Sequence, residues 1–152
     1  MVVSSRGDKE RFYDTIADRF DEVVNRYDLE RRLEIVFDEM LASDVLAGRK
    51  LLDVGCGTGW FAKRAVSHGA HVTALDIGVR LLAKTREKCD ASLVAADACR
   101  LPFPDGAFDI VVSSECIEHT REPLRALAEM CRIVKEGGSL VITVPNKFWR
   151  PS

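Results

Sequence analysis

Residues 51–60 read LLDVGCGTGW, and this stretch decides the fold. The apolar run LLDV is followed by three glycines at alternate positions, Gly55, Gly57 and Gly59. A short apolar run is typical of a buried strand, and clustered glycines directly after it favour a tight turn. We therefore expect a strand, a glycine turn and a helix, with a ligand near the helix N-terminus.

The same alternation continues along the chain. Short β-rich apolar runs occupy residues 50–54, 71–75, 92–96, 108–113 and 139–144, and helical patterns occupy 60–68, 79–88 and 122–135. Strands without polar alternation, separated by helices, indicate a parallel sheet buried on both faces. The sequence predicts an α/β fold, a doubly wound, mostly parallel sheet with five readable strands. Ligands of such sheets bind at the carboxyl ends of the strands.

Two amphipathic helices are expected before the first strand, over residues 9–24 and 29–42. We therefore divide the chain into an N-terminal helical cap, 1–48, and a ligand-binding core, 49–152, within one compact domain. The charged run at 30–32 is expected on a solvated face. In the last helix, we expect one apolar stripe to face the sheet, formed by Leu124, Leu127, Ala128 and Cys131.

Composition excludes several classes of protein. The chain has 152 residues, 47% apolar and 30% charged, with a formal net charge of −2. This balance is typical of a globular domain and supplies no positive field for nucleic acid or anionic lipid. No secretory signal or membrane span is readable. Five cysteines without CxxC spacing favour reduced thiols and a cytoplasmic location.

The residues around the glycines argue against a dinucleotide. A dinucleotide fingerprint places a glycine or alanine where this chain has Trp60, so that the helix packs closely on the strand. Asp53, just before the turn, would repel a bound diphosphate. A ligand with an ammonium and a carboxylate would instead suit Asp53 and the helix N-terminus, respectively. The alternative is that Asp53 makes a structural hydrogen bond to the turn.

Acidic residues also end the next two strands. Asp76 lies 17 residues after Gly59, near the offset of about 20 at which an acidic side chain reaches ribose hydroxyls. Asp97 and the backbone of Ala98 are placed to bind adenine, with Ile77 and Leu101 on either side of the ring. An adenosine joined to an amino acid, without phosphate, is S-adenosyl-L-methionine.

Each of these assignments has a structural alternative. Asp76 is also placed to cap the helix that follows. Asp97 is equally suited to a local Asx turn. Cys56 is best explained as a small residue tolerated in a tight loop.

At these residues the sequence resembles the class I S-adenosylmethionine-dependent methyltransferases, in particular the small-molecule, ubiquinone- and menaquinone-biosynthesis type. The resemblance covers roughly residues 50–145. It rests on LLDVGCGTG, VTALDI, VAADACRLPFPDGAFDIVVSSECIEHTREP and RIVKEGGSLVITVPN. It implies a Rossmann-like fold and S-adenosyl-L-methionine as co-substrate. It also implies that Asp53 and Gly55 to Gly59 contact the methionine part, Asp76 the ribose, Asp97 and Ala98 the adenine, and that Ser113 or Ser114 borders the methionyl group.

The family usually continues past the fifth strand with a helix and an antiparallel hairpin, whereas this sequence ends at PNKFWRPS. We therefore expect residues 139–144 to form an exposed apolar edge strand. Such an edge promotes aggregation unless it is covered. The cover would be the N-terminal helices, another chain such as a homodimer partner, or a further C-terminal segment.

The acceptor side is expected at residues 115–119. His119, assisted by Glu118, is a candidate catalytic base, and a helix-cap or loop role is the alternative. Glu115, Glu118 and His119 are also spaced closely enough to consider a cation, but no further ligand is readable, so we predict no metal site. Tyr13 is a candidate lid residue over the co-substrate, and helix packing is the alternative.

These features predict an enzyme that transfers the sulfonium methyl to a small-molecule acceptor by in-line displacement. Because the leaving thioether is neutral, positioning matters most and no nucleophilic triad is needed. Two alternatives stay open: a non-catalytic or incomplete S-adenosylmethionine-binding module, and, less favoured, an NAD-type nucleotide-binding domain. No basic stripe with aromatic residues suggests a nucleic-acid substrate.

Overall fold

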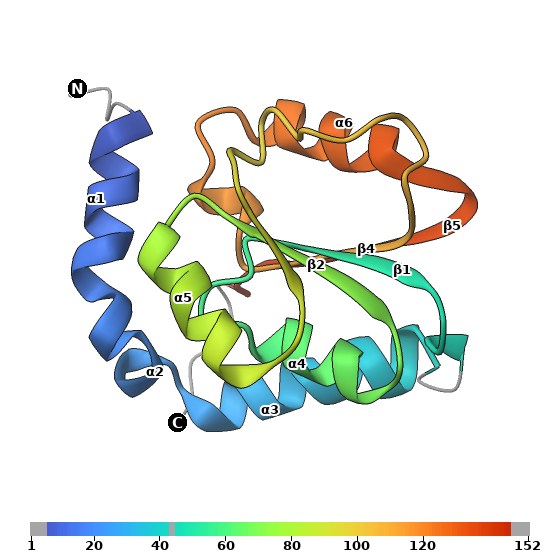
Figure 1. The fold of residues 1–152 in the computed structure, drawn as a ribbon, viewed down its shortest axis with the longest axis horizontal. Helices are drawn as coiled ribbons and strands as arrows, with labels where there is room; N and C mark the ends of the chain where they lie inside the picture. Colours follow the sequence, from blue (N-terminus) through green and yellow to red (C-terminus); the bar gives the residue numbers. More distant parts are fainter. Residues whose placement is uncertain (1–5, 43–44, 147–152) are drawn as a thin grey trace.

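The computed structural model describes residues 6–42 and 45–146 and places a five-stranded parallel sheet at the centre of the molecule (Figure 1). The strand order is β3-β2-β1-β4-β5. The strands are β1 (Lys50–Val54), β2 (His71–Asp76), β3 (Ser92–Ala95), β4 (Phe108–Ser114) and β5 (Val134–Thr143). The order reverses between β1 and β4, which makes this point the topological switch where doubly wound sheets bind ligands. The predicted fold class is confirmed.

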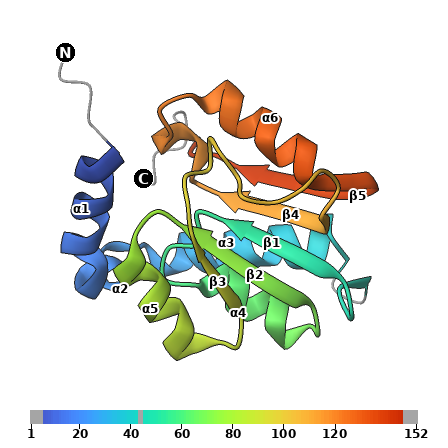
Figure 2. The ribbon, with the colours of Figure 1, turned by 45° about the horizontal axis from the view of Figure 1, so that its top comes forward.

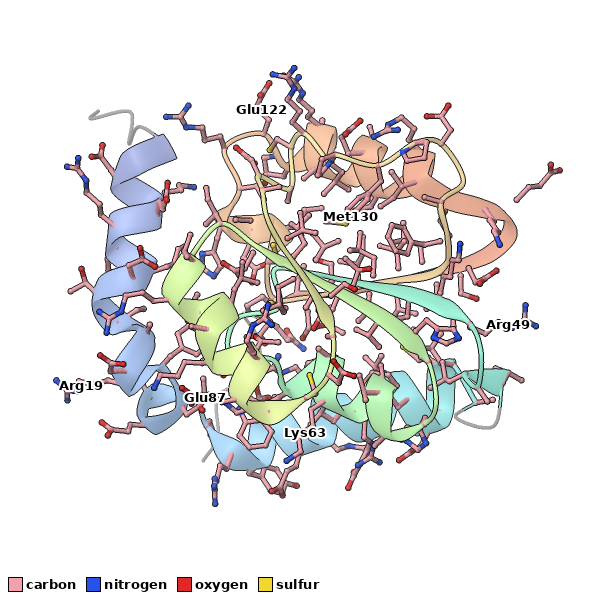
Figure 3. All side chains as sticks on the ribbon, viewed as in Figure 1. Arg19, Arg49, Lys63, Glu87, Glu122 and Met130 are labelled. Atoms are coloured by element: carbon pink, nitrogen blue, oxygen red, sulfur yellow. The ribbon has the colours of Figure 1, made fainter. Side chains whose placement is uncertain are left out.

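Helices cover both faces of the sheet (Figures 1 and 2). One face packs against α3 (Arg26–Glu34), α4 (Trp60–Ser67) and α5 (Val79–Lys88), with a buried core that includes Phe37, Phe61 and Val112. The other face packs against α6 (Pro123–Ile133) and the connection that follows β3. Met130 lies between α6 and the sheet (Figure 3). Apolar burial on both faces explains why the strands read as continuous apolar runs.

The predicted helix over 9–24 is wrong in its middle. The structure has α1 (Arg6–Ile16), a 3₁₀ turn (Ala17–Arg19) and a short α2 (Phe20–Val23). The turn redirects the chain so that acidic side chains of both segments reach α5 and the glycine turn. Apolar periodicity does not register these polar tertiary contacts, so it predicts one uninterrupted helix.

The second N-terminal helix begins earlier than the predicted residue 29. The side chain of Asn25 caps α3 by accepting a hydrogen bond from the backbone N–H of Asp28 at 3.3 Å. A π-helical turn over Ile35–Met40 then ends the helical segment. Leu33 and Phe37 face the core, so this part of the N-terminal region forms a layer of the domain.

The strand β5 starts at Val134, five residues before the predicted 139. Its register against β4 shifts between Phe108 and Ile110. Gly138 sits at this irregularity, and a Cβ there would lie 2.6 Å from the backbone oxygen of Asp109. Strand pairing therefore includes a glycine-rich segment that propensity alone excludes.

The predicted apolar stripe of α6 is wrong. Leu124 is 82% exposed, whereas Ala126, Met130 and Ile133 are fully buried against the sheet. The helix carries apolar residues on two sides, and periodicity does not say which side meets the sheet.

β5 is the outermost strand on its side of the sheet. The N-terminal region covers one face of this strand, because Val141 belongs to the same core as Leu33 and Phe37. Within residues 6–42 and 45–146, β5 pairs with β4 alone. Cover by another chain stays a prediction.

Membrane-spanning helices and disulfide bonds were also considered from the sequence. In the part of the chain that the structure describes, no helix has the length and hydropathy needed to span a bilayer. All five cysteines are free thiols.

Candidate functional site

A cavity of about 270 Å³ opens at the carboxyl ends of the strands, between the glycine turn and the N-terminal helices. It gathers most of the site residues predicted from the sequence. They are Asp53, Gly55, Cys56, Gly57, Asp76, Ile77, Asp97, Ala98, Ser114 and His119. Three predicted residues lie outside the lining: Gly59, Ser113 and Glu118. The cavity thus brings together the ends of β1, β2 and β4 at the switch point.

Two of the three turn glycines make room for protein atoms. A Cβ on Gly55 would lie 2.4 Å from the Sγ of Cys116, and one on Gly59 would lie 2.7 Å from the side chain of Thr85. Their φ angles, +72° and +92°, are in the left-handed region that favours glycine. The close approach that the sequence led us to attribute to a ligand is therefore made, at these positions, by α5 and by the segment after β4.

Asp76 fastens the glycine turn to the start of α5. Its side chain is buried, and its two carboxylate oxygens accept hydrogen bonds from the backbone N–H groups of Gly57 and Gly78, both at 2.9 Å. Burial raises the pKa of Asp76, and these hydrogen bonds oppose that shift. Gly78, and not Asp76, is the N-cap residue of α5, so the predicted capping role of Asp76 is wrong; Asp76 instead accepts from the N–H of that N-cap residue. The backbone N–H of Ile77 also stabilises this carboxylate, so at least one of its four acceptor positions is left for a ligand.

Asp53 is a buried carboxylate at the cavity wall with one oxygen left without a partner. It is 1% exposed, and its Oδ2 has no hydrogen-bond partner among the described residues. Burial raises the pKa of Asp53 to about 7, with the negative charge of Asp76 adding to the shift and the backbone N–H of Ala62 opposing it. A buried carboxylate with an unused oxygen at a cavity wall is suited to a cationic ligand group.

Replacing Asp53 by asparagine should change how stability depends on pH. The folded-state pKa lies above the unfolded value, so the folded protein binds more protons between about pH 4 and 7. The free energy of unfolding should therefore fall across that window in the wild type, by at most about 4 kcal/mol, and fall less in Asp53→Asn. Urea denaturation from pH 4 to 8 measures the difference. The exposed Asp90→Asn serves as control, and parallel curves for wild type and Asp53→Asn would contradict the assignment.

Three of the four residues predicted to surround adenine line the cavity. Asp97 lines the cavity, and its Oδ1 also accepts a hydrogen bond from the backbone N–H of Cys99 at 2.9 Å, so the local turn is present as well. Ile77 and Ala98 line the cavity. Leu101 does not, because it is buried in the second core beneath α6. Leu75 and Leu81 also line the cavity.

Arg32 is a site residue that the sequence analysis missed. Its side chain is only 18% exposed and lines the cavity, so the predicted solvated face at 30–32 is wrong for this residue. Its Nη1 donates to the Oγ of Ser114 at 2.8 Å, which in turn shares a hydrogen bond with Thr143 at 2.8 Å. The spacing from Leu29 to Arg32 places both on one side of α3, a signal that was readable in the sequence.

Residues 115–119, predicted to border the acceptor, follow the end of β4, and Ser113 and Ser114 are its last two residues. Ser113 is fully buried, and its Oγ has no hydrogen-bond partner in the described residues. Glu115 lines the cavity with φ +50°. The His119 side chain is 60% exposed, with its Nε2 3.7 Å from Glu118. Across 6–42 and 45–146 no group of three or more His, Cys, Asp or Glu is arranged to hold a metal ion.

The helix α1 lies beside the cavity mouth. Tyr13 lines the cavity, and burial raises its pKa, with the negative charge of Asp76 adding to the shift. Lys9 donates a hydrogen bond to the backbone oxygen of His119. On α5, the backbone N–H of Arg80 donates to the carboxylate of Asp14 at 3.0 Å, and its guanidinium donates to the carboxylate of Asp18. Polar contacts at both ends therefore hold α1 in place.

Asp21, in α2, joins the N-terminal helices to the glycine turn. Its carboxylate accepts hydrogen bonds from Thr58, from the Nε1 of Trp60 at 3.0 Å and from Lys88 at 3.0 Å. Burial raises its pKa, but these hydrogen bonds outweigh burial and leave the pKa below its usual value. Trp60, which argued against a dinucleotide, is thus part of this junction.

Replacing Asp21 by alanine should loosen the N-terminal helices. The side chain is 41% exposed, so solvent screening limits the loss to about 1 kcal/mol of unfolding free energy. Amide hydrogen exchange in α1 and α2 should rise more than in β1. Glu22→Gln is the matched control, because Glu22 pairs with Arg19 at the surface. Equal exchange in the two variants would contradict the role given to Asp21.

Comparisons with known proteins identify a family and several relatives of this chain. A family model described as a methyltransferase domain matches residues 52–142. The chain is similar to a demethylmenaquinone methyltransferase of Renibacterium salmoninarum, 35% identical over 91% of this chain and 62% of the relative. It is also similar to a malonyl-[acyl-carrier protein] O-methyltransferase of Erwinia billingiae, 32% identical over 84% of this chain and 52% of the relative. The chain spans between about half and three fifths of these relatives.

Solved structures share the fold. The [4+2]-cyclase SpnF superposes with a TM-score of 0.77 over 90% of this chain and 59% of that protein, at 24% identity. An S-adenosylmethionine-dependent methyltransferase from Mesorhizobium loti superposes with a TM-score of 0.59 over 64% of this chain and 47% of that protein, at 30% identity. The first of these likenesses concerns the fold alone.

Proposed function

The chain belongs to the methyltransferase domain family, and from this premise we propose that it transfers a methyl group from S-adenosyl-L-methionine to a small-molecule acceptor. The observation that carries the proposal is the unsatisfied carboxylate of Asp53 beside the buried carboxylate of Asp76 at one cavity. Such a site favours a cationic nucleoside and disfavours the diphosphate of a dinucleotide.

The residues present fit the co-substrate. Asp53 would accept a hydrogen bond from its ammonium group, and Asp76 would accept from its ribose. Asp97 and Ala98 would hold the adenine, and the turn from Gly55 to Gly59 would hold the methionine part together with Ser114. The co-substrate supplies a methyl group on a sulfonium, whose departure leaves a neutral thioether. The protein therefore has to align the acceptor and exclude water more than it has to assist the leaving group.

The proposal also includes a small acceptor group and a cytoplasmic location. Relatives named for demethylmenaquinone and for a malonyl-acyl carrier protein support a small acceptor group. We place the reaction in the cytoplasm, which the free cysteines support. Residues 1–48 would act as a helical cap on a core of residues 49–152, with Tyr13 as part of its lid. A second copy or a C-terminal segment would cover the edge of β5.

The predicted base, His119 assisted by Glu118, also remains a proposal. His119 lines the cavity, but its side chain is mostly exposed at the mouth. A group there would meet an acceptor that enters from solvent. The variants that test it are described with the next inference.

Calorimetric titration with S-adenosylhomocysteine and with NAD tests the co-substrate. We expect saturable binding of S-adenosylhomocysteine that tightens as pH rises toward about 7, because Asp53 must ionise to accept an ammonium. Asp53→Asn should bind more weakly and lose that pH dependence. Binding of NAD in preference to S-adenosylhomocysteine would overturn the proposal. Tight S-adenosylhomocysteine binding without transfer to any acceptor would favour the non-catalytic module.

A further inference from the structure

We propose that Glu115 accepts the proton that a neutral acceptor loses on methylation, and that Arg32 positions the Glu115 carboxylate. The inference rests on the proposed methyl transfer and names the residues that would take up the proton of one class of acceptor. That class is a hydroxyl or a hydroxyl-activated ring carbon, which must give up a proton, in contrast to a carboxylate, which has none to lose.

The backbone places Glu115 against the co-substrate side of the cavity. It directly follows β4, and its N–H donates to the backbone oxygen of Thr143 at 2.9 Å. Its neighbour Cys116 packs on Gly55 of the glycine turn. The φ of +50° lies in the left-handed region, which is unfavourable for a residue with a Cβ. A strained glutamate at the end of a strand and at a cavity wall is typical of a functional position.

Arg32, from α3, pairs with the carboxylate of Glu115. Its Nε lies 3.5 Å from an oxygen of Glu115 and 3.1 Å from one of Asp28. Its Nη1 is engaged by Ser114. The guanidinium therefore ties α3 to the ends of β4 and β5, and any movement of Glu115 has to break this arrangement.

The charges around Arg32 indicate whether a neutral or a negatively charged acceptor is favoured. The charge of Arg32 is already opposed by two carboxylates, Asp28 and Glu115, so it adds little attraction for a third. Two more carboxylates, Asp53 and Asp76, line the same cavity. A negatively charged acceptor is therefore disfavoured, and a neutral one is favoured.

Other groups around the cavity are less suited to take the proton. Burial raises the pKa of Cys116 to about 12, so it stays a thiol. Asp76 is occupied by two backbone N–H groups. His119 is largely in solvent. Glu115 is partly buried, and burial raises its pKa, which makes its carboxylate a better base; Arg32 opposes the shift.

In the transfer step, a bond forms from the acceptor oxygen or carbon to the methyl carbon while the S–CH₃ bond breaks. The electron pair of that bond stays on sulfur, which becomes a neutral thioether. The proton of the acceptor passes to an oxygen of Glu115, and the resulting carboxylic acid returns it to water after product release. Charge is conserved, and no other reactant is needed.

The test uses 2-prenyl-1,4-naphthohydroquinone as the probe acceptor, kept reduced, with labelled S-adenosylmethionine from pH 5 to 9. In the wild type, the rate should rise with pH and level off. In Glu115→Gln it should fall at least about 100-fold and lose that rise. S-adenosylhomocysteine affinity should stay within about twofold, because Glu115 is not given a role in holding the co-substrate. Glu30→Gln, on an exposed face of α3, is the matched control.

Two variants separate chemistry from structure. Glu115→Gly relieves the left-handed strain, so it should lose the rate while unfolding no more easily than the wild type. Arg32→Gln removes the charge that lowers the pKa of Glu115, so the inflection of the rate should move to higher pH. The carboxyl-carbon NMR signal of Glu115, assigned by its absence in Glu115→Gln, should titrate at higher pH in the same variant. Asp28, Glu118 and His119 also act on the pKa of Glu115 and are unchanged in this variant. Arg31→Gln is the control for Arg32→Gln, because Arg31 pairs with Glu34 and Glu39 instead.

The outcomes separate the two proposals. A wild type that binds no S-adenosylhomocysteine defeats the proposed function and this inference together. Binding without transfer to the naphthohydroquinone, or transfer to a malonyl thioester carboxylate instead, overturns the acceptor class. A Glu115→Gln variant as fast as the wild type overturns only the role of Glu115. A rise with pH that disappears in His119→Gln but survives in Glu115→Gln assigns the proton to His119.

Discussion

Replacing Asp76 by alanine should weaken the binding of S-adenosylhomocysteine by about 1.5 to 3 kcal/mol, the range for hydrogen bonds to a charged group. The variant should also unfold more easily, because the N–H groups of Gly57 and Gly78 lose their acceptor. An unsatisfied buried N–H costs about 1 to 3 kcal/mol. Asp76→Asn keeps one acceptor oxygen and should show smaller losses. Calorimetry and urea denaturation measure the two effects.

Two contributions to the weaker binding have to be separated, a direct contact with the ribose and a disturbed glycine turn. The 2′-deoxy analogue of S-adenosylhomocysteine makes the distinction. The wild type should bind it more weakly than the parent compound, and Asp76→Ala should bind both equally. A variant that still prefers the parent compound would refute the ribose contact. Asp90→Ala, at an exposed position two residues after the end of α5, should behave as the wild type.

The second large effect is expected for Gly59→Ala, which should lower the unfolding free energy by about 2 to 5 kcal/mol. Two causes combine. The φ of +92° is unfavourable for alanine, and the new Cβ would lie 2.9 Å from the backbone Cα of Thr85. Because a backbone atom of α5 blocks the site, a change of side-chain rotamer does not relieve the contact.

Gly48→Ala separates these causes. Gly48 has a φ of +73°, but a Cβ there would meet no atom within 4 Å. Its loss should be about 1 to 2 kcal/mol, from backbone strain alone. The excess loss in Gly59→Ala then measures the packing of α5 on the glycine turn. Equal losses for the two variants, in urea denaturation with unchanged m-values, would show that α5 is free to shift.

The order and type of the core elements were predictable from the sequence. From Lys50 to Ser114, strands and helices begin and end within a residue or two of the predicted positions. Apolar periodicity works here because each of these elements buries its side chains against a sheet covered on both faces. It fails at α6, where two sides of the helix are apolar, and at β5, where glycines enter the pairing.

Some residues of the candidate site were predictable from the sequence, and others were not. Asp53, Asp76 and Asp97 follow strands that lie side by side, so their meeting at one cavity follows from topology. Arg32 and Asp21 were missed. Both come from the N-terminal helices. The spacing of Arg32 from the buried Leu29 indicated the inward side of α3, whereas no local pattern distinguishes Asp21 from the other charged residue of α2.

What the sequence determined by itself is the parallel sheet, the glycine turn at its switch point and the row of carboxylates at the strand ends, because strand direction and side-chain period are local properties. Only the tertiary structure decided that α5 and Cys116 fill the space beside two of the glycines. It also decided that Asp53 keeps an oxygen without a partner and that Arg32 pairs with Glu115 at the cavity wall. These features depend on contacts between segments far apart in the chain, where packing and desolvation outweigh local preference.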